Sequence, residues 1–265
     1  MSFSKALLSW LAFPVYVWQG VGVRLRTARL LPPEGPVTGK LPGKGEPLRL
    51  LVLGDSSAAT VGAERTEEGL AGQLAARIGK ATGRPVVWRA AGFNSATSGQ
   101  LRDFVVPNLA HNEWDLIVLS VGTNDAKNFH TVPRFKREFG GLLYALNAKF
   151  PLADIVWSPV LDMQLVPALP AQLGRLLEIR AGLINRMGVR LCQERGALPA
   201  SRLPVLDSSG FSSDGFHASA IGYGAWADHI WNLMAELPSI RGGSEPSASS
   251  LQARPDRSSR NLRAS

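Results

Sequence analysis

The stretch that decides the fold runs from Leu51 to Ser57 and reads LVLGDSS. Its first half is an apolar run typical of a buried strand, and its second half is a Gly-Asp-Ser turn. A serine directly after a buried strand lies at the carboxyl edge of a parallel sheet, where open α/β proteins bind their ligands. The stretch therefore predicts a parallel sheet and, at Ser56, a candidate nucleophile.

The rest of the chain alternates between apolar runs and helical patterns, which is typical of a parallel sheet covered on both faces. The predicted strands are Leu48–Leu53, Val86–Ala90, Leu116–Val121, Asp154–Trp157 and Leu203–Leu206. The predicted helices are Glu67–Thr82, Gly99–His111, Val132–Phe150, Gln172–Arg195 and Ser219–Leu237. We therefore expect a three-layer α/β/α fold with a parallel, flavodoxin-like five-stranded sheet.

Polar segments follow two more of these strands and precede the last helix. They read AAGFN at 90–94, GTND at 122–125 and DGFH at 214–217. Parallel strands end at one edge of a sheet, and the last helix can begin at that same edge. Each segment alone fits an ordinary loop or helix cap, but four motifs in this order favour a catalytic site.

The order of these motifs resembles that of the SGNH (GDSL-type) hydrolases, and the resemblance covers roughly residues 48–237. It implies a serine esterase in which Ser56 is the nucleophile, His217 the base and Asp214 the acid that orients the base. Histidine can take a proton from a serine hydroxyl and return it to a leaving alcohol. Asp207 is a competing acid, and Asp214 is favoured because it lies only three residues before His217.

The same resemblance implies an oxyanion hole built from the backbone N–H of Ser56, the backbone N–H of Gly92 and the side-chain amide of Asn124. Glycine permits a close approach of the backbone, and a neutral amide donates without carrying a charge. Two residues depart from the family pattern. Ser57 stands where a leucine is frequent, and Ala90 stands where the second motif often has an asparagine.

The segment from Pro159 to Leu173 is long and apolar, and it leaves the fourth predicted strand at the active edge. It is expected either to line an acyl pocket or to pack over the core. The residues expected to contact an acyl group are Phe93, Phe129, Met163 and Leu165. The expected substrate is a small or lipid-like ester. Two other functions stay open at this point: an acyltransferase that uses the same acyl-enzyme, and a catalytically idle scaffold that binds a lipid or a partner.

Neither a metal nor a cofactor is expected. No histidine or cysteine has the spacing of a metal site, and no dinucleotide-binding or Walker loop follows the first strand. His130 is expected near the rim of the pocket, and the single cysteine, Cys192, is expected to be a small buried hydrophobe.

Most of the net charge of +8 belongs to the two ends of the chain. Residues 1–47 hold six basic and two acidic residues, and residues 239–265 hold five and two, so only +1 is left for the body. No specific nucleic-acid partner is therefore expected. We expect residues 1–47 to form an apolar segment and basic linker, residues 48–238 a catalytic domain, and residues 239–265 a disordered Ser/Arg-rich tail.

The N-terminal segment is uncharged from Ala6 to Val23 and rich in aromatic and aliphatic residues. It fits a secretory signal peptide, a membrane anchor, or a helix that docks on the body or lies in the membrane interface. Secretion is disfavoured because no small-x-small cleavage site precedes Arg24. Membrane association of residues 6–23 is favoured over a purely soluble helix. The arginines that follow the segment and the single cysteine favour a cytoplasmic catalytic domain.

Overall fold

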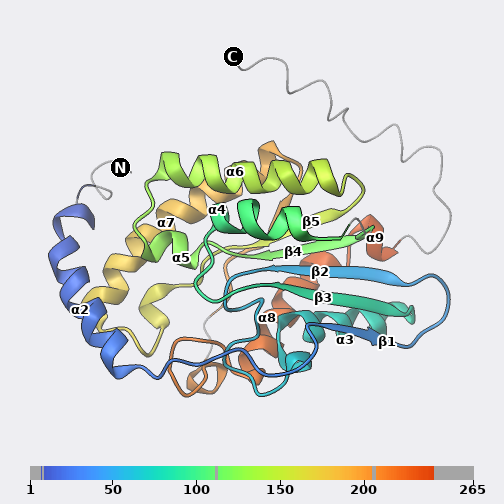
Figure 1. The fold of residues 1–265 in the computed structure, drawn as a ribbon, viewed down its shortest axis with the longest axis horizontal. Coiled ribbons are helices and arrows are strands. Elements are labelled where there is room, and N and C mark those ends of the chain that lie inside the picture. Colours follow the sequence, from blue (N-terminus) through green and yellow to red (C-terminus); the bar gives the residue numbers. More distant parts are fainter. Residues whose placement is uncertain (1–6, 8, 111–112, 205–206, 242–265) are drawn as a thin grey trace, which may run out of the picture.

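The computed structural model of the chain describes residues 7, 9–110, 113–204 and 207–241. A six-stranded sheet lies between two layers of helices (Figure 1). The strands are β1 (Thr38–Leu41), β2 (Leu48–Gly54), β3 (Val86–Gly92), β4 (Leu116–Ser120), β5 (Asp154–Ser158) and β6 (Leu198–Pro199). Their order in the sheet is β1-β3-β2-β4-β5-β6. The expected three-layer fold is confirmed, and five strands are parallel in the flavodoxin-like order, with β1 added antiparallel to β3.

Successive residues of the central strands point to opposite faces of the sheet, so each strand supplies both cores. Leu51 and Leu53 of β2 face one helical layer, and Leu50 and Val52 face the other. The first layer contains α4 (Ser98–Gln100), α5 (Thr123–Lys127), α6 (Val132–Lys149) and α7 (Ala171–Glu194). The second contains α3 (Leu70–Thr82), α8 (Ala220–Met234) and α9 (Pro238–Arg241). Burial on both faces explains why these strands read as continuous apolar runs.

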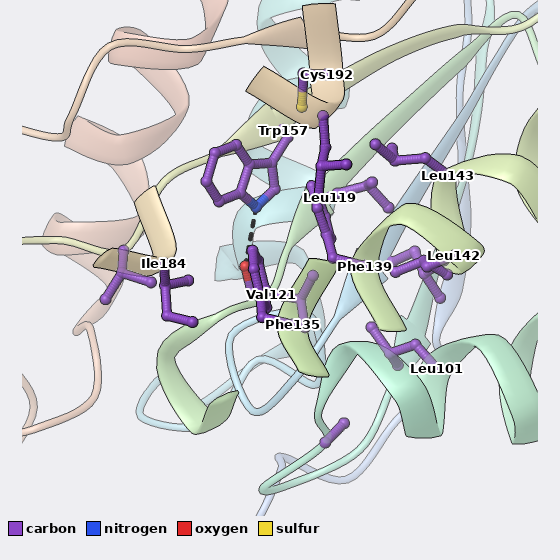
Figure 2. Close-up of a cluster of buried hydrophobic side chains, with 14 of the residues drawn as sticks. Leu101, Leu119, Val121, Phe135, Phe139, Leu142, Leu143, Trp157, Ile184 and Cys192 are labelled. Carbon is purple, nitrogen blue, oxygen red and sulfur yellow. Dashed lines mark hydrogen bonds between the residues drawn. The ribbon is translucent and has the colours of Figure 1, made fainter. Parts of the chain in front are cut away.

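The core of the first layer is organised around the indole ring of Trp157 (Figure 2). Its Nε1 donates a hydrogen bond of 2.9 Å to the carbonyl oxygen of Val121, and its ring centroid lies 5.1 Å from that of Phe139. Gly188 of α7 makes room for the ring, because a Cβ there would come within 2.2 Å of it. Cys192 is fully buried in the same cluster, as expected, and burial raises the pKa of its thiol to about 12.

The predicted last strand, Leu203–Leu206, is wrong at Leu203 and Pro204, which belong to no strand, while residues 205–206 lie outside the described residues. The strand that pairs with β5 is instead β6, which contributes only two residues to the ladder. Pro199 has no N–H to continue that ladder, and the chain then leaves the sheet. Leu203 instead lines a cavity at the carboxyl edge of the sheet.

The predicted helix Gly99–His111 is also wrong as a continuous helix. It is divided into α4, a π-helical turn at Leu101–Val105 and a 3₁₀ turn at Val106–Asn108, and residue 111 lies outside the described residues. Pro107 lacks the N–H that a further helical turn needs, so the apolar periodicity continues while the α-helix does not.

Strand β1 was not predicted, and it lies within residues 1–47, before the expected start of the catalytic domain. Its four residues are half-exposed at the edge of the sheet and carry no apolar run. Gly39 lies against the indole of Trp88, where a Cβ would come within 2.4 Å of the ring. Pairing with β3, a tertiary effect, is therefore what makes this segment a strand.

The N-terminal helix α2 (Phe13–Arg26) lies beside α7, at one end of the molecule (Figure 1). No helix among the described residues is both long enough and apolar enough to cross a membrane. Helix α9 covers the start of the expected tail, and residues 242–265 lie outside the described residues.

Candidate active site

Ser56 lies in a tight turn directly after β2, at the carboxyl edge of the sheet. The N–H of Asp55 donates to the carbonyl of Ser120, 3.1 Å away, which anchors the turn to the neighbouring strand β4. The N–H of Val61 donates to the carbonyl of Ser56, 3.0 Å away, and closes the turn. The side chain of Ser56 is thereby held at the edge where the apolar strand ends.

The structure brings together the three side chains that were expected to act as nucleophile, base and acid. Nε2 of His217 lies 3.1 Å from Oγ of Ser56, although the two residues are 161 positions apart. Nδ1 of His217 lies 2.6 Å from Oδ2 of Asp214. The imidazole therefore bridges a hydroxyl and a carboxylate, which is the geometry of a serine nucleophile with an oriented base.

Asp214 is held by more than the imidazole. Its Oδ1 accepts hydrogen bonds from Oγ of Ser212 and from the backbone N–H groups of Phe216 and His217, at 2.8 to 2.9 Å. Burial alone would raise the pKa of Asp214, but the hydrogen bonds from the side chain and backbone of His217 and from Phe216 outweigh it and lower the pKa. The carboxylate is consequently ionised where it faces the imidazole.

A polar network supports the nucleophile turn from below. Oδ1 of Asp55 accepts hydrogen bonds from the backbone N–H and from Oγ of Ser57, and Oγ of Ser57 lies 2.7 Å from Oγ of Ser120. Burial raises the pKa of Asp55, against the opposing hydrogen bonds from Ser57 and the charges of Lys127 and His217. Ser57 therefore binds the turn to β4, a polar role that the leucine frequent in the family pattern could not play.

The three expected oxyanion donors differ in their surroundings. The backbone N–H of Ser56 has no hydrogen-bond partner among the described residues. Nδ2 of Asn124 donates to Oδ2 of Asp55 at 3.2 Å and to the carbonyl of Ala96 at 3.0 Å. Gly92 is the last residue of β3 and pairs with Gly54 at the end of β2. A Cβ at Gly92 would lie within 2.1 Å of the carbonyl oxygen of Gly54, so this position admits only glycine without a backbone shift.

A cavity of about 70 Å³ opens beside Ser56 and His217. Its floor includes Ser120 and Ser158, at the ends of β4 and β5. Its walls are mainly apolar and come from two loops, contributing Val160, Leu161, Met163, Val166, Phe211 and Phe216. The segment after β5 therefore lines the cavity beside the candidate nucleophile.

Of the four residues expected to contact an acyl group, Met163 lines this cavity, and the other three are not among its lining residues. Phe93 and Leu165 are exposed at the surface. Phe129 is buried in a left-handed conformation, with φ of 53°, and its ring packs against Tyr16 of α2 at a centroid distance of 4.5 Å. The apolar character of Phe129 serves a contact with the N-terminal helix, which local sequence did not reveal.

Three polar residues fasten the loop after β5 to helix α7. Arg202 forms a bidentate pair with Glu178, at 2.6 and 2.8 Å, and also donates to the carbonyls of Val160 and Leu161. Asn185 of α7 binds the N–H and the carbonyl of Val160. We call Glu178, Asn185 and Arg202 the loop clamp. Sequence carried no signal for the clamp because Arg202 lies 24 positions after Glu178 and none of the three residues belongs to a motif.

Glu178→Gln is expected to weaken the clamp, since the amide offers one acceptor where the carboxylate offers two charged ones. A charge-assisted hydrogen bond contributes about 1.5–3 kcal/mol, so the KM for a short-chain nitrophenyl ester should rise about tenfold, while kcat changes less. Steady-state kinetics measure the split. Glu194→Gln removes an exposed pair with Arg190 on the same helix and is the matched control. Equal kinetics for the two variants would contradict a role of the clamp in shaping the cavity.

Asp207, the competing acid, lies apart from this arrangement. Its carboxylate is exposed and accepts hydrogen bonds from the side chain and the backbone N–H of Ser209, which lower its pKa.

His130 is not at the cavity rim but fully buried. Its Nδ1 lies 3.2 Å from a carboxylate oxygen of Asp125 and 3.2 Å from one of Glu138.

These three buried residues are the one cluster among the described residues whose ligand atoms lie close enough to hold a metal ion, all within 4.8 Å of one another. Nδ1 of His130 is within hydrogen-bond distance of Oδ1 of Asp125, at 3.2 Å, whereas Oε2 of Glu138 has no hydrogen-bond partner among the described residues. The guanidinium of Arg134 also binds Glu138 at 2.7 Å and balances its charge. The hydrogen bonds of Asp125 with His130 and of Glu138 with Arg134 therefore form a polar network between α5 and α6, next to Asn124.

Solved structures with this fold are hydrolases of several kinds. TesA superposes with a TM-score of 0.57 at 18% identity, over 70% of this chain and 97% of its own. A putative GDSL-like lipase from Parabacteroides merdae ATCC 43184 gives 0.57 at 18% identity, over 70% and 94%. The psychrotrophic esterase EstA from Pseudoalteromonas sp. gives 0.53 at 18% identity, over 69% and 94%. At these identities the likeness carries the fold alone.

A comparison with curated proteins gave no match. The model of the GDSL-like lipase/acylhydrolase family matches residues 52–225, which include the nucleophile turn, the Asn124 segment and the His217 segment. Because this match spans more than half of the 265 residues, the chain belongs to the GDSL-like lipase/acylhydrolase family and is a carboxylic ester hydrolase of that type.

Proposed function

We propose that the protein hydrolyses carboxylic esters through an acyl-enzyme formed on Ser56. The observation that carries this proposal is the hydrogen-bonded series from Ser56 through His217 to Asp214, at 3.1 and 2.6 Å. Two segments that are distant along the chain meet here. They place a hydroxyl, an imidazole and a carboxylate in the hydrogen-bonded arrangement that nucleophilic catalysis requires.

In the proposed first half-reaction, Oγ of Ser56 attacks the ester carbonyl while Nε2 of His217 takes its proton. The resulting tetrahedral intermediate breaks the bond to the alkoxide oxygen, and His217 returns the proton to the leaving alcohol. In the second half-reaction, water attacks the acyl-enzyme with His217 again as base, which releases the acid and restores Ser56. Asp214 keeps Nδ1 protonated and stabilises the imidazolium.

The oxyanion formed in each step needs hydrogen-bond donors. The unpaired N–H of Ser56 is the first we propose, and the N–H of Gly92 is the second. The third is the amide of Asn124, which would exchange its 3.2 Å bond to Asp55 for the oxyanion. Each such donor contributes about 3 kcal/mol in comparable sites.

The proposed substrate is an ester with a short apolar acyl group. A cavity of about 70 Å³ is well below the roughly 300–1,000 Å³ of pockets that enclose whole ligands. Its apolar walls, Met163 among them, suit an acyl chain, whereas the alcohol side would extend toward solvent and the exposed Phe93 and Leu165.

The proposal also includes a membrane surface and a compartment. Lipid-like esters reside in membranes, and residues 6–23 are the segment through which the enzyme would reach them. A cytoplasmic catalytic domain is supported by Arg24, Arg26 and Arg29, which follow the apolar segment, and by the single cysteine.

A fluorophosphonate probe tests the proposal on the intact protein. Attack by Oγ of Ser56 on phosphorus expels fluoride, and mass spectrometry should find the adduct on the peptide that contains Ser56. The esterase EstA was solved inhibited by monoethylphosphonate, so inhibition by a phosphonate has a precedent in this fold. Hydrolysis of acetyl, butyryl and octanoyl nitrophenyl esters should then fall with chain length.

Folded protein that leaves Ser56 unlabelled would overturn the proposal and support the idle scaffold. An added alcohol separates hydrolysis from acyl transfer, because a transferase would convert it to a new ester at the expense of free acid.

A further inference from the structure

Helix α2 is held on the body by one of its faces. Tyr16 donates a hydrogen bond of 2.6 Å from its hydroxyl to the carbonyl of Lys127, at the end of α5. The rings of Phe13 and Tyr16 pack against Phe129, at centroid distances of 5.2 and 4.5 Å. Further along the helix, Gln19 binds the side chain of Gln172 on α7 at 2.9 Å. These contacts fix which side of the helix faces outward.

The outward side is apolar as well. On α2, Trp18, Val21 and Leu25 are spaced by three and four residues, share one face and are exposed. Leu7 and Leu11, which precede α2, are exposed as well, and we call these five residues the outer seam. Trp18 is 78% exposed and Leu25 is 81% exposed. Nine of the 17 exposed large apolar side chains of the described chain fall within residues 7–31. A helix on the surface of a protein in water normally has polar residues on its outward face. An apolar outward face therefore indicates contact with another apolar surface.

Positive charge borders the outer seam. Arg24, Arg26 and Arg29 are exposed, and no described carboxylate forms an ion pair with them. The first acidic residue of the chain is Glu34. The seam thus combines apolar side chains, an exposed indole and unpaired guanidinium groups, which is the composition of helices that lie in the interface of an anionic bilayer.

We propose that the outer seam docks α2 in the plane of a bilayer that contains anionic phospholipid. Leu11, Val21 and Leu25 enter the acyl boundary, Trp18 lies at the depth of the headgroups, and the arginines contact lipid phosphates. A second copy of the chain fits the outer seam less well than a bilayer does. Paired helices usually place opposite charges beside their apolar seam, and this seam is bordered by positive charge alone.

This docking would bring the cavity close to its substrate, a point that rests on the proposed function. Tyr16 contacts Lys127, and Nζ of Lys127 lies 4.6 Å from the ring of Phe216, which lines the cavity beside His217. Two contacts therefore separate the inner face of α2 from the candidate site, so an ester in the membrane lies near it once the seam is docked.

Vesicle flotation of the full chain tests the docking. Protein should float with vesicles of phosphatidylcholine mixed with phosphatidylglycerol, and less with vesicles of phosphatidylcholine alone. The double variant Trp18→Glu, Leu25→Glu should bind the mixed vesicles at least about tenfold less, because charged residues replace the apolar contact. The matched control is Leu152→Glu with Ile221→Glu, which changes exposed apolar residues elsewhere, and it should bind like the unaltered protein.

Both double variants should hydrolyse a soluble acetyl ester at the unaltered rate, which shows that they fold. Absence of vesicle binding by the unaltered protein, or equal binding by the seam variant, would overturn the proposal. The proposal would also be overturned if light scattering found a dimer of the unaltered protein and a monomer of the seam variant, because the seam would then bind a second copy of the chain. If vesicles bind but no ester is hydrolysed, the proposed function fails and the docking stands.

Discussion

Ser56→Ala is expected to abolish ester hydrolysis. Removal of the nucleophile of a serine hydrolase costs up to about 10⁶ in kcat, and an oxyanion hole without a nucleophile retains only a small part of the rate enhancement. We expect a loss of at least about 10³-fold for acetyl nitrophenyl ester, with no change in thermal stability beyond about 1 kcal/mol, since Ser56 makes few contacts besides His217. Steady-state rates and a thermal melt measure both.

The chain offers a matched control in a second serine-histidine pair. Oγ of Ser201 lies 3.2 Å from Nε2 of His229 at the surface, with no described carboxylate on the other ring nitrogen. Ser201→Ala should retain full activity. Activity of Ser56→Ala within tenfold of the unaltered protein would remove Ser56 as the nucleophile, whatever the control shows.

Asp214→Asn is expected to lower kcat by about 10³–10⁴-fold. The Oδ1 of asparagine can keep the bonds to the N–H groups of Phe216 and His217, so the loop should hold its shape. Its NH₂ group, however, meets Nδ1 of His217 and favours the tautomer with the proton on Nε2, which cannot accept from Ser56. Circular dichroism and kinetics on one ester separate a misfolded protein from an intact but inactive one.

Asp207→Asn is the control for the competing acid and should leave kcat unchanged. If instead Asp207→Asn lost the activity and Asp214→Asn kept it, the assignment of the acid would be reversed.

The lowered pKa of Asp214 also sets a pH dependence. Its pKa is lower in the folded protein than the roughly 3.9 of an unfolded chain, so the ionised carboxylate stabilises the fold above that value. The contribution is lost as the pH falls through the folded pKa. Throughout the neutral range the carboxylate stays charged, so Asp214 itself causes no loss of stability or activity there.

The three-layer architecture was predictable because burial on both faces leaves a continuous apolar run in each central strand. Leu116–Ser120 is buried at all five positions, and its hydrophobicity alone identifies it as a strand. Thr38–Leu41 has no such run, because an edge strand is stabilised by its pairing with β3 and not by its own composition. Leu203 shows the limit of this signal, because an apolar residue can be buried by a loop as well as by a regular element.

The residues of the candidate site could be predicted from the sequence, but the side chains that hold them in place could not. Ser56, Asn124, Asp214 and His217 belong to short motifs whose chemistry can be read locally. Their partners cannot, since Asp55 meets Asn124 across 69 positions and Arg202 meets Glu178 across 24. Phe129 was expected to contact the acyl group because it lies close to a motif along the chain. It instead packs against Tyr16 of α2, a helix near the N-terminus.

By itself, the sequence determined the layered sheet and identified candidate residues at one of its edges, because each follows from periodicity or from a motif a few residues long. The tertiary structure alone decided that His217 reaches Ser56, that a clamped loop lines the cavity, and that one side of α2 is occupied while the other faces outward. Such outcomes depend on the packing of elements distant along the chain, and no local pattern encodes the distance between two side chains.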